Sequence, residues 1–156
     1  MDFLQLNIKH LLSATSSIIR REVDCMIDDL LFAKTISVLY DSSSFTLQDF
    51  IPHQSYNQEN TGSSRRKNVL LCVSKDGQDV EMIEAARQYR EDGDQVLTIT
   101  ANRKSDLADL SDRVVGFDLK LDNIDGNYNS LLYEQVIYIL FTTIKQSIEK
   151  RNPVMH

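Results

Sequence analysis

The segment from Asn68 to Phe117 constrains the fold of this chain more than any other, because apolar runs alternate in it with a helical pattern. Residues 69–73 form a continuous apolar run, which is typical of a strand covered on both faces. Apolar side chains then recur at helical spacing up to Gly93, and short apolar runs follow at 96–100 and 113–117. Strands that alternate with helices predict βαβ units and a parallel sheet.

Both flanks of this segment are predicted to be largely helical. Residues 1–33 carry apolar side chains at steps of three and four, and the polar residues between 13 and 17 leave either two helices or one interrupted helix. Residues 33–40 are rich in β-branched side chains and predict a strand. A long helix is expected over 130–150. Its apolar face is too wide for one narrow stripe, so this helix is either central or shared with a partner subunit.

The predicted fold class is therefore α/β: a three-layer α-β-α sandwich with a mostly parallel, flavodoxin-like sheet, in a single domain over residues 1–156. A short amphipathic segment is expected at 45–51, before Pro52. Residues 53–67 are almost devoid of apolar side chains and predict a mobile loop. The initiating Met1 favours a complete chain.

Composition excludes several classes of function. The net charge of −6 argues against a nucleic-acid-binding surface, and the basic residues 65–67 are interpreted as a solvated loop. No apolar run has the length needed to span a bilayer, and the first ten residues do not look like a secretory signal. A cytoplasmic protein without membrane attachment is expected. Cys25 and Cys72 lie in apolar runs and are predicted to be buried, reduced thiols.

Two loops are expected to lie at the carboxyl ends of strands, where open parallel sheets bind their ligands. They are Asp41–Ser44 and Ser74–Asp79. Serine hydroxyls and free backbone N–H groups at a helix start can hold a phosphate, but the same residues can also be ordinary helix caps. For the serines of these two loops both interpretations stay open. For Ser105, which precedes a short helix ending near Leu110, the cap is preferred.

Catalysis receives little support from the residues. Isomerisation of a sugar needs a positioned base. His10 lies in the first helix, His53 in the predicted loop and His156 at the end of the chain, while Glu134 is expected to be solvated or salt-bridged. The sequence has no Ser-His-Asp order, no P-loop and no metal-ligand spacing. We therefore expect no enzymatic activity, no cofactor and no metal.

Three stretches carry a resemblance to a known family: SKDGQD at 74–79, VLTIT at 96–100 and SDLA at 105–108. In these stretches the chain resembles the SIS (sugar isomerase) domain, whose first strand ends in Ser-x-Ser-Gly-x-Thr/Ser. The sugar-phosphate-sensing domains of RpiR-type transcription regulators are the most similar in style. The resemblance implies the SIS fold and a sugar or sugar-phosphate ligand.

The chain departs from the family at the residues that would hold the phosphate. The second serine and the final threonine of the motif are replaced by Asp76 and Asp79, and Tyr40 and Asp41 stand where the first loop of the family has glycines. A carboxylate at a phosphate site repels the ligand and occupies the helix N-terminus that the phosphate would use. Residues 1–33 are too short and too acidic for the helix-turn-helix domain of the regulators, so no direct nucleic-acid binding is expected.

The expected function is a stand-alone, non-catalytic SIS-like module that binds a carbohydrate derivative or serves in regulation. The alternatives are a sugar-phosphate isomerase, or a fold without ligand that serves only in assembly. A homodimer through the N- and C-terminal helices is expected. Asp76 and Asp79 should favour a neutral or cationic sugar over a phosphorylated one. The predicted ligand-binding residues are Ser43, Ser44, Ser74, Asp76, Gly77, Gln78 and Asp79.

Overall fold

The structure, a computed structural model, describes residues 2–41, 65–119 and 126–151. The elements in chain order are α1 (Phe3–Ser16), α2 (Arg20–Phe32), β1 (Thr35–Tyr40), β2 (Asn68–Ser74), α3 (Val80–Glu91), β3 (Gln95–Thr100), α4 (Asp106–Asp109), β4 (Arg113–Gly116) and α5 (Gly126–Arg151).

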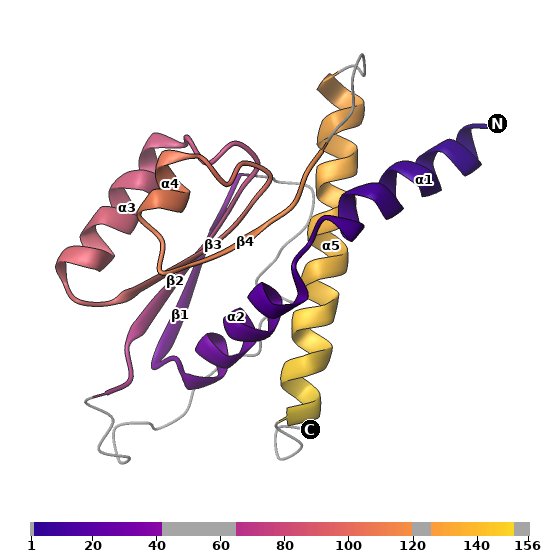
Figure 1. The fold of residues 1–156 in the computed structure, drawn as a ribbon. Coiled ribbons are helices and arrows are strands. Elements are labelled where there is room, and N and C mark those ends of the chain that lie inside the picture. The colour runs from indigo at the N-terminus through magenta and orange to yellow at the C-terminus, as the bar shows by residue number, and fades with distance from the viewer. Residues whose placement is uncertain (1, 42–64, 120–125, 152–156) are drawn as a thin grey trace.

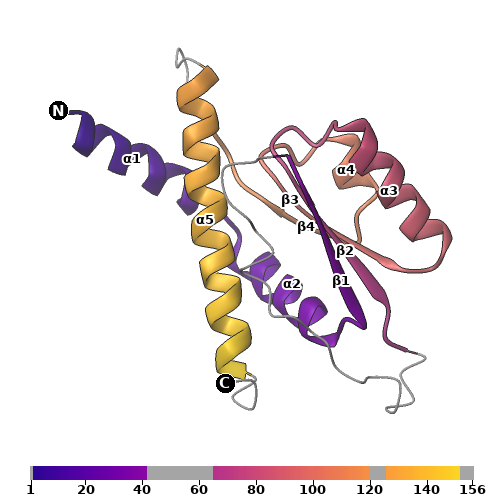
Figure 2. The same ribbon diagram turned by 180° about the vertical axis from the view of Figure 1, so that it is seen from behind.

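The strands form one sheet in the order β1-β2-β3-β4, and every neighbouring pair is parallel. Helices α3 and α4 cover one face of the sheet, while α2 and α5 cover the other (Figure 1). The predicted three-layer α/β fold is confirmed. Figure 2 shows the same layers from behind, with α1 projecting from α5 on the side away from the sheet.

Strand β2 explains why its sequence is a continuous apolar run. Val69, Leu71 and Val73 pack into the core with α2 and α5. Leu70 and Cys72 point to the opposite face and pack with α3 and α4. Side chains alternate between the faces of a strand, so a strand with helices on both sides needs apolar residues at every position.

The N-terminal segment forms two helices rather than one. Asp2 begins α1 with a capping box, in which its carboxylate accepts from the N–H of Gln5 and the Gln5 side chain accepts from the N–H of Asp2. At the other end the Ser17 hydroxyl donates to the carbonyl of Ala14 at 2.6 Å, and Ile19 is extended at the start of α2. The polar side chains between the two helices bond the backbone locally, which favours a break in the helix.

Helix α5 begins four residues before the predicted residue 130. Tyr128, in its first turn, holds the start of the helix against α1. The Tyr128 hydroxyl lies 2.8 Å from Nδ1 of His10, and the two rings meet edge to face at 5.6 Å. Gly126 and Asn127 have low helix propensity, so this tertiary contact offsets an unfavourable local sequence. Within the described ranges, no helix is long and apolar enough to cross a membrane.

The predicted segment 45–51 and residues 53–64 of the predicted loop lie outside the described residues. The last three residues of that loop are described, and two of them contact the end of α2 and the connection from α2 to β1. The Arg66 guanidinium lies 5.1 Å from the centre of the Phe32 ring, and the carbonyl of Lys67 accepts from the N–H of Lys34 at 2.8 Å. These contacts fix the entrance to β2.

At the β4 edge of the sheet, side chains engage the outward-facing backbone groups of Gly116. The Arg103 guanidinium donates to the Gly116 carbonyl at 2.9 Å and pairs with the Glu22 carboxylate at 2.8 Å. Glu22 in turn accepts from the N–H of Gly116 at 3.5 Å. The two side chains together satisfy backbone groups that a further strand would otherwise use.

The two cysteines are both free thiols but differ in their surroundings. Cys72 is buried in β2, as predicted, and burial raises its pKa from 9.0 to about 12, with a further contribution from the charge of Asp79. Cys25 is partly exposed on α2, so the prediction that it is buried is wrong. The reason is that Cys25 lies beside the short edge strand β4, which covers less of α2 than a longer strand would.

We expect N-ethylmaleimide to label Cys25 rapidly in the native protein at pH 8, and Cys72 only after unfolding. The rise in pKa alone lowers the thiolate fraction of Cys72 about a thousandfold at this pH, and burial adds a steric barrier. Mass spectrometry of the labelled protein would count the modified thiols, and Cys25→Ser should remove the rapid label. Equal labelling of both thiols would contradict the burial of β2.

Because the folded state holds the Cys72 proton more tightly than the unfolded state does, the stabilising contribution of Cys72 should be complete below pH 9.0 and be lost as the pH rises toward about 12.

Candidate functional site

The candidate site lies at the carboxyl ends of the parallel strands, where Asp41 follows β1, the loop 74–79 follows β2, and the loop 101–105 follows β3. The first turns of α5 lie at the same end of the sheet (Figure 1). Open parallel sheets present backbone N–H groups and helix starts at this end. The site is therefore built mainly from loop backbone and from one face of α5.

In the loop 74–79, the protein's own side chains occupy the backbone donors. The N–H of Gly77 donates to Oγ of Ser74, that of Gln78 to Oδ1 of Asp76, and that of Met82 to Oδ1 of Asp79, each at 3.0 Å. These are the donors that a phosphate at the start of α3 would use. Asp79 also serves as the N-cap of α3. A phosphate would have to displace two carboxylates and remain beside them.

The size of the repulsion between a phosphate and these two carboxylates follows from Coulomb's law. A carboxylate and a phosphate charge about 4 Å apart repel by about 1 kcal/mol in bulk water and about 4 kcal/mol near a protein surface. Asp76 and Asp79 are exposed, so the lower part of this range applies to each of them. Two such groups together still offset most of what one helix N-terminus contributes to anion binding.

Gly77 fixes the loop against the start of α4. Its φ angle is +67°, and a Cβ atom at this position would lie 2.0 Å from Oγ of Ser105. The Gly77 carbonyl accepts from the N–H of Leu107 at 3.1 Å. Ser105 itself caps α4 by accepting from the N–H of Ala108, which confirms the predicted cap. The glycine is required by both the backbone conformation and the close approach.

Asp41 ties three elements together at the site. Its Oδ2 accepts from the N–H of Lys75 at 2.7 Å, and its Oδ1 accepts from the hydroxyl of Tyr133 at 3.2 Å. Burial raises the pKa of Tyr133 well above its ordinary value, and the negative charge of Asp41 adds to this effect. Tyr133 is therefore a hydrogen-bond donor throughout the physiological range. The Lys75 ammonium donates to Oγ of Ser130 at 3.4 Å, which adds a second link between the loop and α5.

Asn129 is a residue of the site that the sequence did not indicate. Its Oδ1 atom is buried and has no hydrogen-bond partner among the described residues. Residues four apart share a face of a helix, so Asn129 lies on the same side of α5 as Tyr133, next to Ser130. An unsatisfied buried acceptor is costly, and a bound hydroxyl or ammonium group would satisfy it. Its position four residues before Tyr133 indicates only that the two residues share a helix face, so the sequence carried no signal for this acceptor.

The predicted site residues fall into three groups. Ser43 and Ser44 lie outside the described residues. Ser74 and Gly77 are buried and shape the loop from inside. Asp76, Gln78 and Asp79 are exposed and face solvent at the carboxyl edge.

The candidate bases lie apart from one another. His10 is bonded to Tyr128 between α1 and α5, and Glu134 follows Tyr133 on α5 and is partly exposed. Across residues 2–41, 65–119 and 126–151, no group of three or more His, Cys, Asp or Glu side chains could hold a metal ion.

Comparison with solved structures identifies the class of fold. The sugar isomerase domain of an RpiR transcription factor from Sphaerobacter thermophilus superposes with a TM-score of 0.67 at 12% identity, over 97% of this chain and 90% of that chain. The Vibrio vulnificus NanR protein, solved with ManNAc-6P, gives a TM-score of 0.70 at 16% identity over 97% of this chain and 63% of that chain. A Methanococcus jannaschii protein, for which a 3-hexulose-6-phosphate isomerase function was inferred, gives a TM-score of 0.64 at 18% identity. The match covers 96% of this chain and 89% of that chain.

This chain has the fold of the sugar isomerase (SIS) domains. Its structural neighbours include a domain of a transcription factor, a protein solved with ManNAc-6P, and a protein with an inferred isomerase function. No family model matches the sequence, and no curated protein sequence matches it either.

Proposed function

We propose that this chain is a non-catalytic SIS-fold module that binds an unphosphorylated carbohydrate derivative at the carboxyl edge of the sheet, in a regulatory role like that of the RpiR-type sensor domains. The observation that carries the proposal is the occupation of the loop donors at Gly77, Gln78 and Met82 by the protein's own side chains. What this end of the sheet offers a ligand is mainly acceptors, which suit hydroxyl and ammonium groups.

The acceptors come from two sides. Asp76 is exposed on the loop, and the Asn129 amide oxygen lies on α5 without a partner among the described residues. A sugar hydroxyl can donate to either group, and an ammonium group can donate to both while offsetting the negative charge of the loop. An amino sugar is therefore the preferred ligand class, ahead of a neutral sugar and well ahead of a sugar phosphate.

A thermal-shift panel at constant ionic strength tests the proposal. Glucosamine or glucose at about a hundred times its Kd should stabilise the protein by about 3 kcal/mol, which corresponds to a rise in Tm of several degrees. Glucosamine 6-phosphate and glucose 6-phosphate, added at the same molar concentration as the parent sugars, should raise the Tm less. Asp76→Asn, which keeps an acceptor but removes the charge, should weaken the glucosamine effect more than the glucose effect. Glu91→Gln, a charge change at the far end of α3, serves as the control.

An isomerase remains the alternative function, because one structural neighbour carries an inferred isomerase activity and Glu134 lies next to Tyr133 on α5. Turnover of a sugar phosphate that is lost in Glu134→Gln, in a variant that remains folded, would replace the proposal by this one. If no carbohydrate stabilises the protein and none is turned over, the third reading remains: a fold without ligand that serves in assembly.

We also propose that the module is a homodimer through α1 and α5. Helix α1 leaves four large apolar side chains exposed on the part that projects from the body, and α5 leaves three exposed. A cavity of about 650 Å³ lies between α5 and the α1–α2 junction, and its walls are partly apolar. A second copy would cover both features at once. The exposed residues are Phe3, Leu4, Ile8, Leu12, Leu131, Tyr138 and Ile139.

Light scattering coupled to size exclusion should give the mass of a dimer for the native chain, and about half of that mass for Ile8→Glu/Leu12→Glu. The two glutamates would place charge in the apolar surface of α1 without touching the core of the monomer. Val80→Glu is the matched control, because Val80 is also exposed but lies at the start of α3 on the other side of the sheet. A monomeric native chain, or a dimer that survives the double change, would contradict this interface.

A further inference from the structure

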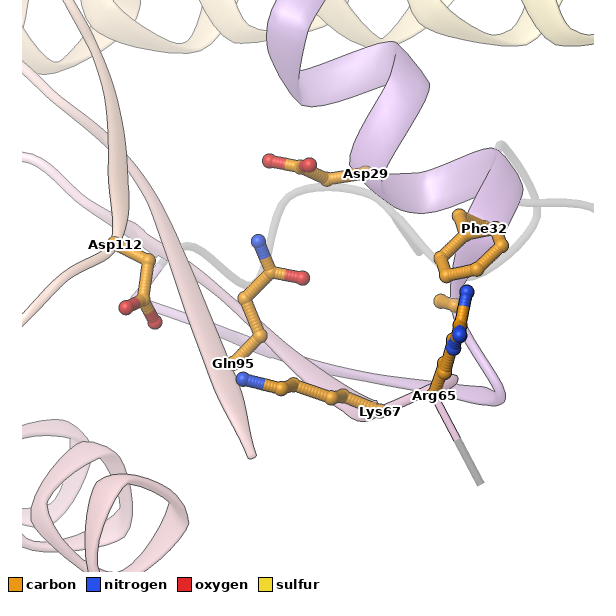
Figure 3. A pocket seen from close by; sticks show the side chains of 7 residues that line it. Asp29, Phe32, Arg65, Lys67, Gln95 and Asp112 are labelled. Carbon is orange, nitrogen blue, oxygen red and sulfur yellow. The ribbon is translucent and has the colours of Figure 1, made fainter. Parts of the chain in front are cut away.

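A second cavity lies at the amino ends of the strands, at the opposite end of the sheet from the candidate site. Its volume is about 230 Å³, and it is lined by the end of α2 and by the residues that lead into β2, β3 and β4 (Figure 3). Parallel sheets usually bind ligands at their carboxyl ends, so no sequence rule points to this place. The lining residues used below are Asp29, Phe32, Arg65, Lys67, Gln95 and Asp112.

In this cavity the acidic side chains have partners within the protein, whereas the basic side chains form no ion pair among the described residues. Asp29 accepts from Nε of Arg113 at 2.8 Å, and Asp112 accepts from the N–H of Val96 at 2.8 Å. Among the described residues, neither Arg65 nor Lys67 forms an ion pair. Within the described part of the chain, no carboxylate therefore neutralises these two cations, although the protein as a whole carries a net charge of −6.

The remaining walls supply an acceptor side and an apolar side. The Gln95 carboxamide and the Asp29 carboxylate project toward the same space (Figure 3). The Asp29 side chain is only 17% exposed, so its charge lies at the wall and not in bulk solvent. Phe32 borders the cavity on another side and is 53% exposed. A ligand that fits would place an anion near Lys67, a cationic donor near Asp29, and an apolar group on the Phe32 ring.

We propose that this cavity binds a small zwitterion, an α-amino acid with an apolar side chain. Its carboxylate meets Lys67, its ammonium group meets Asp29 and Gln95, and its side chain packs on Phe32. The cavity is smaller than the usual site for a drug-sized molecule, which agrees with a ligand of this size. Charge-assisted hydrogen bonds at both ends make recognition depend on both groups.

A simpler role for the two cations is to neutralise the negative C-terminal end of α2, whose last turn has no basic residue of its own. That role affects the stability of the free protein but does not depend on any ligand. The two roles are therefore separated by an experiment in which the ligand concentration is varied.

The test uses three compounds with one carbon skeleton and the full chain. Calorimetric titration with L-leucine should show saturable binding in the millimolar range or tighter. 4-Methylpentanoate lacks the ammonium group and 3-methylbutylamine lacks the carboxylate, and each should bind about tenfold more weakly or not at all. In ¹⁵N-resolved NMR spectra, L-leucine should shift the side-chain amide signal of Gln95 and leave the backbone signal of Gln78 unchanged.

Two variants complete the test. Lys67→Met should weaken L-leucine binding about tenfold, with little effect on 3-methylbutylamine, while Lys104→Met, a matched change at an exposed lysine of the β3–α4 loop, should have no effect. Gln95→Met gives an independent variant should Lys67→Met fold poorly. The proposal is overturned if L-leucine does not bind saturably, if it binds no better than both analogues, or if neither variant weakens binding. The carboxyl-edge site plays no part in any of these outcomes.

Discussion

Replacing Gly77 with alanine is expected to lower the free energy of unfolding by about 2–3 kcal/mol. A φ angle of +67° costs an alanine about 1–2 kcal/mol. The new Cβ atom would also lie 2.0 Å from Oγ of Ser105, which is buried and caps α4. Moving Ser105 loses that cap, which contributes about 0.5–2 kcal/mol. Alanine also lowers the entropy of the unfolded chain, which offsets less than about 1 kcal/mol of this loss in stability.

Gly93→Ala is the matched control for this prediction. Gly93 has a similar φ angle of +78°, but nothing lies within 4 Å of the Cβ position. Only the cost of placing an alanine at a positive φ angle remains, less the entropy gain in the unfolded state, so a loss of about 1 kcal/mol is expected. Urea unfolding followed by circular dichroism would give both values from the shift of the midpoint at constant m. If the two variants lost the same stability, the close packing between Gly77 and Ser105 would be refuted.

The second large effect is a gain of function. Asp76→Ser/Asp79→Thr restores the serine and threonine of the SIS phosphate motif, and it should raise affinity for a sugar phosphate by about ten- to a hundredfold. Each change removes a repulsion of about 1 kcal/mol or more. It also replaces a carboxylate acceptor by a hydroxyl that can donate to phosphate. Calorimetry with glucosamine 6-phosphate, glucose 6-phosphate and their parent sugars at fixed ionic strength would measure the change.

The gain has to be specific to the loop. Asp24→Asn/Glu91→Gln removes two exposed negative charges from α2 and α3, and therefore controls for net charge alone. The threonine at 79 can still cap α3, so the fold of the double variant should be kept. If sugar phosphates bound no better after the change, or if the charge control gained as much, the carboxylates would not be what disfavours phosphate.

The order of elements could be predicted from the sequence because local patterns and tertiary packing agree there. Residues 69–73 are apolar at every position since helices cover both faces of β2, and this signal does not depend on distant residues. The same holds for Ser105 and Gly93, whose roles at helix ends are local. The start of α5 was missed because it depends on the contact between Tyr128 and His10, which are far apart in the chain.

The location of the candidate site could be predicted from the sequence, but most of the contacts between its residues could not. Charge alone indicated that Asp76 and Asp79 disfavour phosphate, whereas the structure adds that both carboxylates bond the backbone donors of their own loop. The link from Asp41 to Tyr133, and the unsatisfied Asn129 oxygen, depend on how α5 lies across the strand ends. No spacing in the sequence encodes that placement.

The side chains over Gly116 also bear on aggregation. An edge strand with free backbone groups is a template on which other chains can add strands. Arg103 and Glu22 engage the carbonyl and the N–H of Gly116, and Glu22 belongs to α2. Growth of an intermolecular sheet from β4 is therefore fully blocked only while α2 is docked, because Glu22 both engages the N–H of Gly116 and pairs with Arg103. A partly unfolded chain in which α2 has detached would expose this edge, so the helix protects solubility as well as the core.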